Sequence, residues 1–375
     1  MPGLLPNVDP DGLLEYSVVY TDRSLNHMSD LFQNVMNDVS SSLKEVYNAE
    51  AVVLVPGGGT YAMEAVARQF ATDQSCLVLR NGWFSFRWSQ IFEMGNIPSQ
   101  EMVLKARRIS EDSQSPFAPP DINEVVELIK KKKPHMVFAP HVETSSGIIL
   151  PDNYIKSVAA AVHSVGGMFV LDCIASGAIW VDMQDCGVDV LISAPQKGWS
   201  ASPAFGMVML SSDAADKINE TKSTSFSCDL LKWLQIMQAY ENGGHAYHAT
   251  MPTDAIKHFR DTVKDTAEFG FENARKKQQE LGDKARALLQ RYNINSVAAK
   301  GFHAPGVVVS YTTDKEIQNG SKFKAIGMQI AAGVPLQCDE GDDYQTFRLG
   351  LFGLDKLKDV DAAVKKLENA LNLVT

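Results

Sequence analysis

Short apolar runs alternate with amphipathic stretches between about residues 50 and 210 of the chain. Such runs are typical of buried strands, and the stretches between them are typical of helices that cover a sheet. The predicted strands are 51–55, 75–80, 100–105, 135–140, 167–172, 189–193 and 204–210. The predicted helices include 60–71, 84–94, 121–133 and 152–165, with Asp121 and Asp152 as N-caps and Gly166-Gly167 closing the last. The pattern predicts an α/β fold with a mostly parallel sheet sandwiched by helices.

The character of the sequence changes near residue 254. A polar, helix-favouring stretch rich in Glu, Lys, Gln and Ala runs from Lys264 to Tyr292. Strand-like pieces follow at 306–311 and 346–350, and then a final amphipathic helix at 355–372. This order predicts a smaller α/β domain joined through a long helix. We therefore expect a large domain over residues 17–253 and a small C-terminal domain over 254–375, with residues 1–16 packing near the small one.

Composition and charge exclude several classes of partner. The 375 residues are 45% hydrophobic and 21% charged, as in an ordinary globular protein. A net charge of −10 argues against a nucleic acid or an anionic membrane as a partner. The one basic run, Lys130 to Lys133, ends a predicted helix before Pro134 and is interpreted as a solvated helix end.

The cysteines and the N-terminus predict a cytoplasmic protein. The five cysteines are widely spaced, and no pair has metal-ligand spacing, so we expect free thiols, no bound metal and a reducing compartment. The stretch from Met1 to Pro6 has no basic region, and no segment reaches the roughly 20 apolar residues of a membrane span. We therefore expect a soluble, unprocessed chain.

A lysine and an aspartate follow two neighbouring predicted strands. Asp172 comes directly after the apolar run Met168–Leu171, and Lys197 lies in the polar turn after Val190–Ile192. Each residue alone has an ordinary interpretation, as a strand-end aspartate or an exposed lysine. Together, at one edge of a sheet, they fit a site for pyridoxal phosphate (PLP). The lysine would hold the aldehyde as a Schiff base, and the aspartate would keep the ring nitrogen protonated.

Three further turns at predicted strand ends favour a ligand at the same edge. Pro56–Thr60 carries three glycines before a helix, where backbone N–H groups can approach an anion, although such turns are more often structural. Asn81–Arg87 is rich in aromatic residues, which could stack on a cofactor ring or belong to the core. His141–Gly147 is a polar cluster of the kind found where open α/β sheets bind ligands, or a plain turn.

Arg348 stands in the otherwise apolar strand-like piece Phe347–Gly350. A buried arginine requires an anionic partner, because desolvating it unpaired costs several kcal/mol. A substrate carboxylate fits its bidentate fork, and an internal Asp or Glu fits equally well. Tyr247–Pro252 is a polar-aromatic turn before a helix and is unremarkable alone.

With these motifs in order, the chain resembles class V aminotransferases of PLP fold type I, and among them the alanine/serine–glyoxylate/pyruvate aminotransferase group. The resemblance covers residues from about 27 to 370. It implies a transaminase that moves an amino group from a small amino acid to a 2-oxo acid by ping-pong kinetics. It also implies a homodimer with shared active sites.

The resemblance assigns a role to each matching residue. Lys197 would be the Schiff-base lysine, Asp172 would pair with the pyridine nitrogen, and Arg348 would bind the substrate α-carboxylate. The cofactor phosphate would be held by Gly58, Gly59, Thr60 and Gln196, and by Tyr247 and Thr250 of the neighbouring subunit. The ring would lie between Phe84 and Ile174, with Thr144 near its hydroxyl group.

The N-terminal region departs from the family pattern. Relatives open with a Gly-Pro loop that closes over the substrate, whereas this chain has an unrelated stretch over residues 6–26 and Met28 in place of the usual arginine. That loop helps to choose the substrate, so the departure leaves the amino donor and the preferred acceptor open.

Two alternative functions remain at this point. A PLP-dependent lyase, such as a desulfurase or β-eliminase, would share the cofactor chemistry. Desulfurase relatives carry histidines where this chain has Gln196 and Phe84, and Cys338 is the one cysteine to consider for a leaving-group role. A non-enzymatic PLP-binding module would normally carry a DNA-binding domain, and the sequence has no such pattern.

Overall fold

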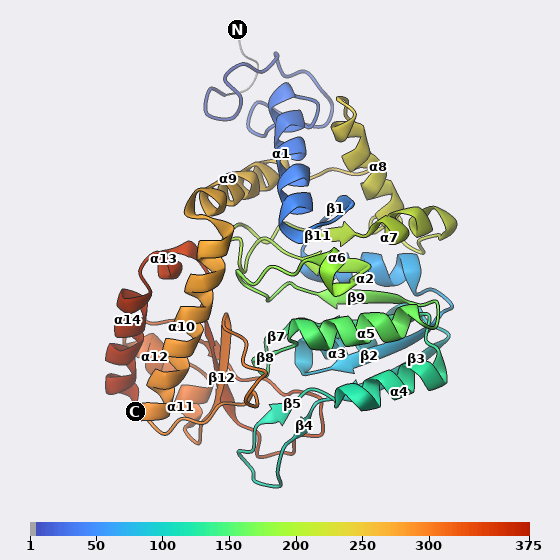
Figure 1. Cartoon of the computed structure of the whole chain (residues 1–375). Coiled ribbons are helices and arrows are strands. Elements are labelled where there is room, and N and C mark those ends of the chain that lie inside the picture. The colour runs from blue at the N-terminus through green and yellow to red at the C-terminus, as the bar shows by residue number, and fades with distance from the viewer. Residues whose placement is uncertain (1–4) are drawn as a thin grey trace.

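The computed structural model describes residues 5–375 and contains a large seven-stranded sheet (Figure 1). Its order is β1-β11-β10-β9-β6-β2-β3. Neighbouring strands are parallel except at β11, which runs antiparallel to both β1 and β10. The strands are β1 (Ala51–Pro56), β2 (Ser75–Arg80), β3 (Gln100–Lys105), β6 (Met136–Pro140), β9 (Met168–Asp172), β10 (Val190–Ser193) and β11 (Phe205–Leu210). The prediction of a mostly parallel sheet is confirmed.

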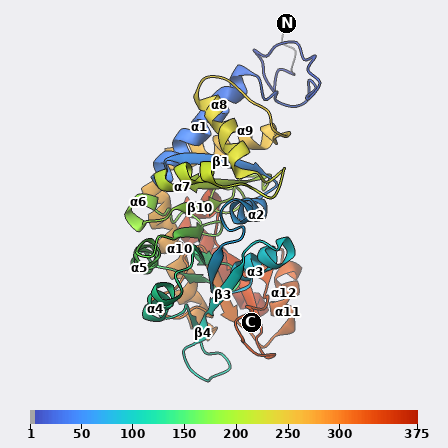
Figure 2. The ribbon, with the colours of Figure 1, turned by 90° about the vertical axis from the view of Figure 1, so that its right-hand side faces the viewer.

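Helices cover both faces of this sheet because its central strands are apolar on both sides. Figure 2 shows α4 (Ile122–Lys132), α5 (Asp152–His163) and α6 (Met183–Cys186) on one face and α2 (Gly59–Phe70) and α3 (Trp83–Gly95) on the other. Asp121 caps α4 as predicted, accepting from Asn123 N–H at 2.9 Å. Asp152 is not the cap of α5, because Pro151 precedes it in that position.

Further elements lie at one end of the large sheet and in its connections. Helix α1 (Asp30–Tyr47) packs on α8 (Leu230–Glu241) and on α9 (Thr253–Phe269). The remaining short elements here are β4 (Arg107–Arg108), β5 (Phe117–Ala118), β7 (Val142–Glu143), β8 (Ile148–Ile149), α7 (Ser212–Lys217) and a 3-10 turn at Ile218–Glu220. No helix among residues 5–375 is long and apolar enough to cross a membrane.

A second sheet forms the C-terminal part of the molecule, with antiparallel order β12-β14-β13. The predicted long helix is two helices, α9 and α10 (Phe271–Arg291), because Gly270 between them has a φ of +90° that ends the first. Helix α10 packs along α14 (Val360–Val374). The remaining elements are β12 (Val307–Tyr311), β13 (Ala331–Ala332), β14 (Thr346–Gly350), α11 (Lys315–Gln318), α12 (Ser321–Ala325) and α13 (Leu354–Leu357).

The N-terminal segment, residues 5–28, lies around the start of α1 and far from the C-terminal sheet (Figure 1). The packing of residues 1–16 near the small domain, residues 254–375, stays a prediction. Leu25 N–H donates to Asp254 at 2.9 Å and the Tyr20 hydroxyl donates to the Met251 carbonyl at 3.1 Å, which ties the segment to the start of α9. Residues 1–4 of the expected 1–16 stretch lie outside the described residues.

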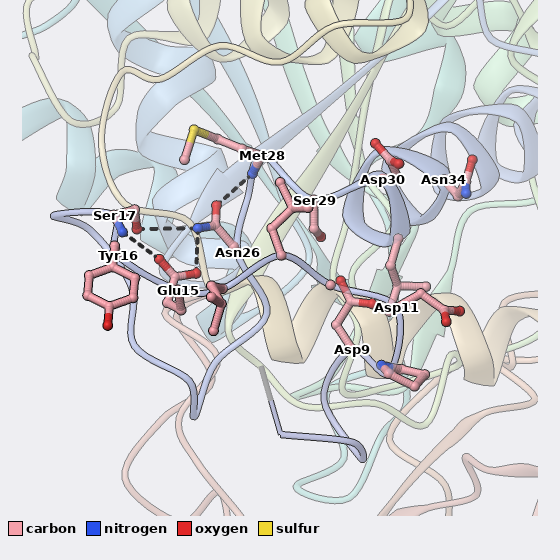
Figure 3. A pocket seen from close by; sticks show the side chains of 15 residues that line it. Asp9, Asp11, Glu15, Tyr16, Ser17, Asn26, Met28, Ser29, Asp30 and Asn34 are labelled. Carbon is pink, nitrogen blue, oxygen red and sulfur yellow. Dashed lines mark hydrogen bonds between the residues drawn. The ribbon is translucent and has the colours of Figure 1, made fainter. Parts of the chain in front are cut away.

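Figure 3 shows how the N-terminal segment folds over the start of α1. The Asn26 amide donates to the Glu15 carboxylate at 2.7 Å, and its carbonyl oxygen accepts from Met28 N–H at 2.8 Å. Around this polar link the segment lines a surface cavity of about 610 Å³. Leu13 and Tyr16 are 87% and 90% exposed, so the segment carries apolar side chains that one copy of the chain does not bury.

Candidate active site

The carboxyl edge of the large sheet gathers most of the predicted site residues. Strands β9 and β10 are parallel neighbours, with Asp172 paired to Ile192, so the turn that carries Lys197 begins beside Asp172. Eight predicted residues line one cavity at this edge: Gly59, Thr60, Phe84, Thr144, Asp172, Ile174, Gln196 and Lys197. Residues that are far apart in sequence thus meet because parallel strands end at the same edge.

Burial dominates the electrostatics of the central pair. Asp172 is 7% exposed and accepts a hydrogen bond from Ile174 N–H at 2.9 Å. Desolvation raises the pKa of its carboxyl group to about 7, and the nearby Glu143 adds to the rise. Burial also lowers the pKa of the Lys197 amine, and the positive charge of Arg348 lowers it further. The neutral amine favoured in this way is the form that a base or nucleophile requires.

Glu143 organises the turn that presents Phe84. It is fully buried, and its two oxygens accept five hydrogen bonds of 2.7–3.1 Å. The donors are the backbone N–H groups of Phe84, Ser85 and Ser145 and the hydroxyl groups of the two serines. A Cβ at Gly82 would lie 2.1 Å from the Ser145 hydroxyl oxygen, so only glycine permits this approach. The carboxylate also stabilises the N-terminus of α3.

The glycine turn before α2 leaves the start of that helix open. Gly58 is its N-cap and provides no side-chain hydrogen bond. A Cβ at Gly59 would lie 2.5 Å from the Ile174 side chain, which explains why this position is glycine. The first N–H groups of α2 therefore face the cavity without a side-chain cap, an arrangement that favours an anion.

Two arginines approach the Phe84 ring. The Arg348 guanidinium carbon lies 5.6 Å from the ring centre, and its Nε donates to the Ala332 carbonyl at 2.8 Å. The Arg87 guanidinium carbon lies 5.2 Å from the same centre and lines the cavity. Sequence reasoning selected Arg348 and overlooked Arg87 and Glu143. Both overlooked residues are charged and belong to the motifs Asn81–Arg87 and His141–Gly147 that come after predicted strands, which is the signal that could have identified them.

Four predicted residues do not line this cavity: Gly58, Tyr247, Thr250 and Arg348. Gly58 precedes α2 as its N-cap and Arg348 approaches the Phe84 ring, whereas Tyr247 and Thr250 belong to a separate loop. The hydroxyl groups of Tyr247 and Thr250 are 2.9 Å apart in the loop between α8 and α9, and both side chains are exposed. Tyr247 packs against the ring of His27 from the N-terminal segment, with 5.6 Å between ring centres. Within one chain, these residues do not line the cavity that contains Lys197.

Comparison with known proteins gives the family. The family model described as aminotransferase class-V matches residues 12–315. The chain belongs to the class V aminotransferases. Enzymes of this family use PLP, so the cofactor, the enzyme class and the fold predicted from the sequence are confirmed.

Individual relatives resemble this aminotransferase over nearly its whole length. It is 26% identical to the soluble hydrogenase small subunit of a Synechococcus strain, with 92% of this chain and 87% of the relative covered. It is 25% identical to the alanine–glyoxylate aminotransferase of Rattus norvegicus, with 93% and 82% covered. The solved alanine–glyoxylate aminotransferase of a Nostoc species superposes with a TM-score of 0.77 at 20% identity, covering 92% of this chain and 88% of that one.

The residues of the cavity fit the cofactor. A buried carboxylate such as Asp172 is costly without a positive partner, and a protonated pyridine nitrogen is such a partner. The uncapped start of α2 suits a phosphate group, and the Phe84 ring suits a flat aromatic partner.

Proposed function

We propose that this aminotransferase moves the amino group of a small amino acid, such as alanine or serine, to a 2-oxo acid such as glyoxylate or pyruvate. The observation that carries the proposal is that Lys197 and Asp172 line one cavity, while Arg348 lies 5.6 Å from the centre of the Phe84 ring in the same cavity wall and lowers the pKa of Lys197. The relatives named for alanine and glyoxylate support this substrate class.

The roles proposed for the side chains follow from their chemistry. When bound, PLP supplies an electron sink for the charge that develops at the substrate Cα. Lys197 Nζ takes the proton from that Cα, since its lowered pKa favours the neutral amine. Asp172 holds a proton on the ring nitrogen, and Arg348 binds and orients the substrate carboxylate.

The cofactor would be held mainly by groups of one chain. We assign its phosphate to Gly58, Gly59, Thr60 and Gln196, its two ring faces to Phe84 and Ile174, and its hydroxyl group to Thr144. The large domain, residues 17–253, supplies all of these, and the small domain, residues 254–375, supplies Arg348.

The proposed enzyme is a homodimer that works in the cytoplasm. Tyr247 and Thr250 are exposed and hydrogen-bonded to each other, so they are available to reach the phosphate in a neighbouring subunit. Leu13, Tyr16 and Val18 of the N-terminal segment are also exposed, and large apolar side chains in one segment favour burial against a second copy.

The lyase alternative is less favoured. Cys338 is buried, and its thiol donates to the Arg80 carbonyl at 3.4 Å. Burial raises the pKa of this thiol to about 12, with a smaller contribution from Glu143. A neutral, buried thiol is unsuited to attack a leaving sulfur atom.

The test is an amino-acid panel assayed against glyoxylate and against pyruvate. We expect 2-oxo acid formation with small donors and parallel lines in double-reciprocal plots, as ping-pong kinetics require. Release of ammonia or sulfide without an amino acceptor would instead support the lyase. Protein that stays colourless after incubation with PLP would contradict both.

A further inference from the structure

Arg87 is a second cation of the cofactor cavity, beside Lys197. It lies on α3 one turn after Phe84, and its guanidinium Nη1 donates to the Thr60 hydroxyl at 3.1 Å. The guanidinium is thus held between the first turn of α2 and the Phe84 ring, and it lines the cavity with Lys197. This position follows from helix geometry, because residues three apart lie on the same helix face.

No carboxylate among residues 5–375 lies within 4.0 Å of the Arg87 guanidinium. The side chain is half-buried, and its one hydrogen-bond acceptor there is a neutral hydroxyl group. Other arginines of this protein, such as Arg107 and Arg260, do have carboxylate partners. Asp172 lines the same cavity and is close enough for Arg87 to lower its pKa, but it makes no ion pair with Arg87. A partly desolvated guanidinium that faces a cavity without an ion-pair partner is arranged to receive an anion.

The anion could belong to the cofactor or to the substrate, and the contacts favour the cofactor. Arg87 is bonded to Thr60, whose own N–H belongs to the uncapped first turn of α2. An anion at the start of α2 would therefore meet the helix dipole and the free backbone N–H groups of that helix. It would also meet the Thr60 hydroxyl group and the Arg87 guanidinium. Arg348, which we assign to the substrate carboxylate, is anchored elsewhere, through Ala332 on β13.

We propose that Arg87 is a phosphate-binding residue that pairs with the phosphate group of PLP, together with Thr60. The inference rests on the proposed cofactor site and adds a residue to it. The pair supplies the positive charge that the phosphate needs, since the glycine turn itself carries no charged side chain. An Arg–phosphate contact is charge-assisted and can be bidentate, whereas the backbone donors alone are neutral.

The test compares PLP with pyridoxal, which has the same ring and aldehyde but lacks the phosphate. Apoenzyme would be titrated with each vitamer, following the absorbance of the bound form, for wild type, Arg87→Met and Arg87→Lys. We expect Arg87→Met to weaken PLP binding by about tenfold or more, the size expected for a charge-assisted hydrogen bond, with pyridoxal binding changed less than about twofold. Arg87→Lys should recover part of the affinity for PLP, because it restores the charge without the fork.

Two controls separate the possible failures. Arg348→Met, which removes the other arginine at the Phe84 ring, should leave the ratio of PLP to pyridoxal affinity at its wild-type value. Equal losses for both vitamers in Arg87→Met, or no loss for either, would overturn the phosphate role of Arg87. If wild-type protein bound neither vitamer, the proposed cofactor site itself would be wrong, and the role of Arg87 with it. The ³¹P resonance of bound PLP, shifted in Arg87→Met and unchanged in Arg348→Met, is a second readout that does not depend on activity.

Discussion

The cofactor cavity and the surface made by the N-terminal segment with the α8–α9 loop differ in how fully one chain organises them. In the cavity, the buried Glu143 carboxylate accepts five hydrogen bonds. Asp172 ends β9 and Lys197 follows the neighbouring strand β10, and the charge of each affects the pKa of the other. On the surface, Tyr16 and Tyr247 are exposed in loops. The difference indicates that one chain builds the ring-binding part of the site, whereas the outer part is the surface that we propose is completed by a second copy.

The largest expected effect comes from Lys197 in the cavity. Replacing Lys197 with Ala removes both the amine that holds the cofactor and the base, so we expect kcat to fall by about 10³-fold or more. Steady-state and single-turnover transamination rates are the measurements. Lys156→Ala is the matched control, because that lysine is exposed on α5 and pairs with Asp185. A Lys197→Ala enzyme working at the wild-type rate would remove the basis of the proposed function.

Next in size is the loss of Glu143. Glu143→Ala leaves several buried donors without an acceptor, and we expect a loss of about 3 kcal/mol or more in the free energy of unfolding. Glu143→Gln keeps the shape and should lose less. Urea unfolding of both variants checks this, with Glu127→Ala, an exposed position on α4, as a control that should stay within about 0.5 kcal/mol. If Glu143→Ala left the free energy of unfolding unchanged, the turn that carries Phe84 would have to be held by other contacts.

A smaller effect concerns Asp172 and pH. Burial disfavours the charged form and raises the pKa of the Asp172 carboxyl group from its ordinary value of 3.8 to about 7 in the fold. A raised pKa means that the folded protein binds the proton more tightly than the unfolded one. Ionisation therefore destabilises the cofactor-free fold as pH rises from about 4 to about 7, and the full loss persists above that range.

Asp172→Asn removes this cost. We expect the cofactor-free variant to melt at a higher temperature than wild-type apoenzyme at pH 8, with a difference that shrinks as pH falls and vanishes near pH 4. Thermal unfolding of both proteins without PLP, at pH values across this range, measures it. A melting-temperature difference that did not change with pH would show that the Asp172 carboxyl group does not carry the linkage.

The sequence predicts more of the cofactor cavity than of the outer surface. The strands and the edge that joins Lys197 to Asp172 follow from local apolar runs, since strand ends in a parallel sheet converge whatever the distant contacts. The hydrogen bond of Arg87 to Thr60 joins two helices, and no local pattern specifies it. The position of the N-terminal segment depends on Asp254 and Met251, more than 200 residues away. The roles of Tyr247 and Thr250 came from resemblance alone, because they concern a second chain.

The smallest effect, and the sharpest test of the outer surface, comes from Tyr247. Its side chain is 55% exposed, so Tyr247→Phe should leave the stability of the chain within about 0.5 kcal/mol. If the hydroxyl group reaches the phosphate of a partner subunit, the loss of one hydrogen bond should weaken PLP binding by about three- to tenfold. Tyr16→Phe, at another exposed tyrosine, should leave the affinity unchanged.

Mixed dimers then separate a shared site from one within a single chain. In a dimer of one Lys197→Ala subunit and one Tyr247→Phe subunit, shared sites place both lesions in one site and leave the other intact. Half of the sites should then bind PLP with wild-type affinity. Sites confined to one chain would give no intact site, since the only remaining Lys197 would sit beside the altered Tyr247. A mixed dimer without a wild-type phase in its PLP titration would therefore remove the reason for treating Tyr247 as a partner's ligand.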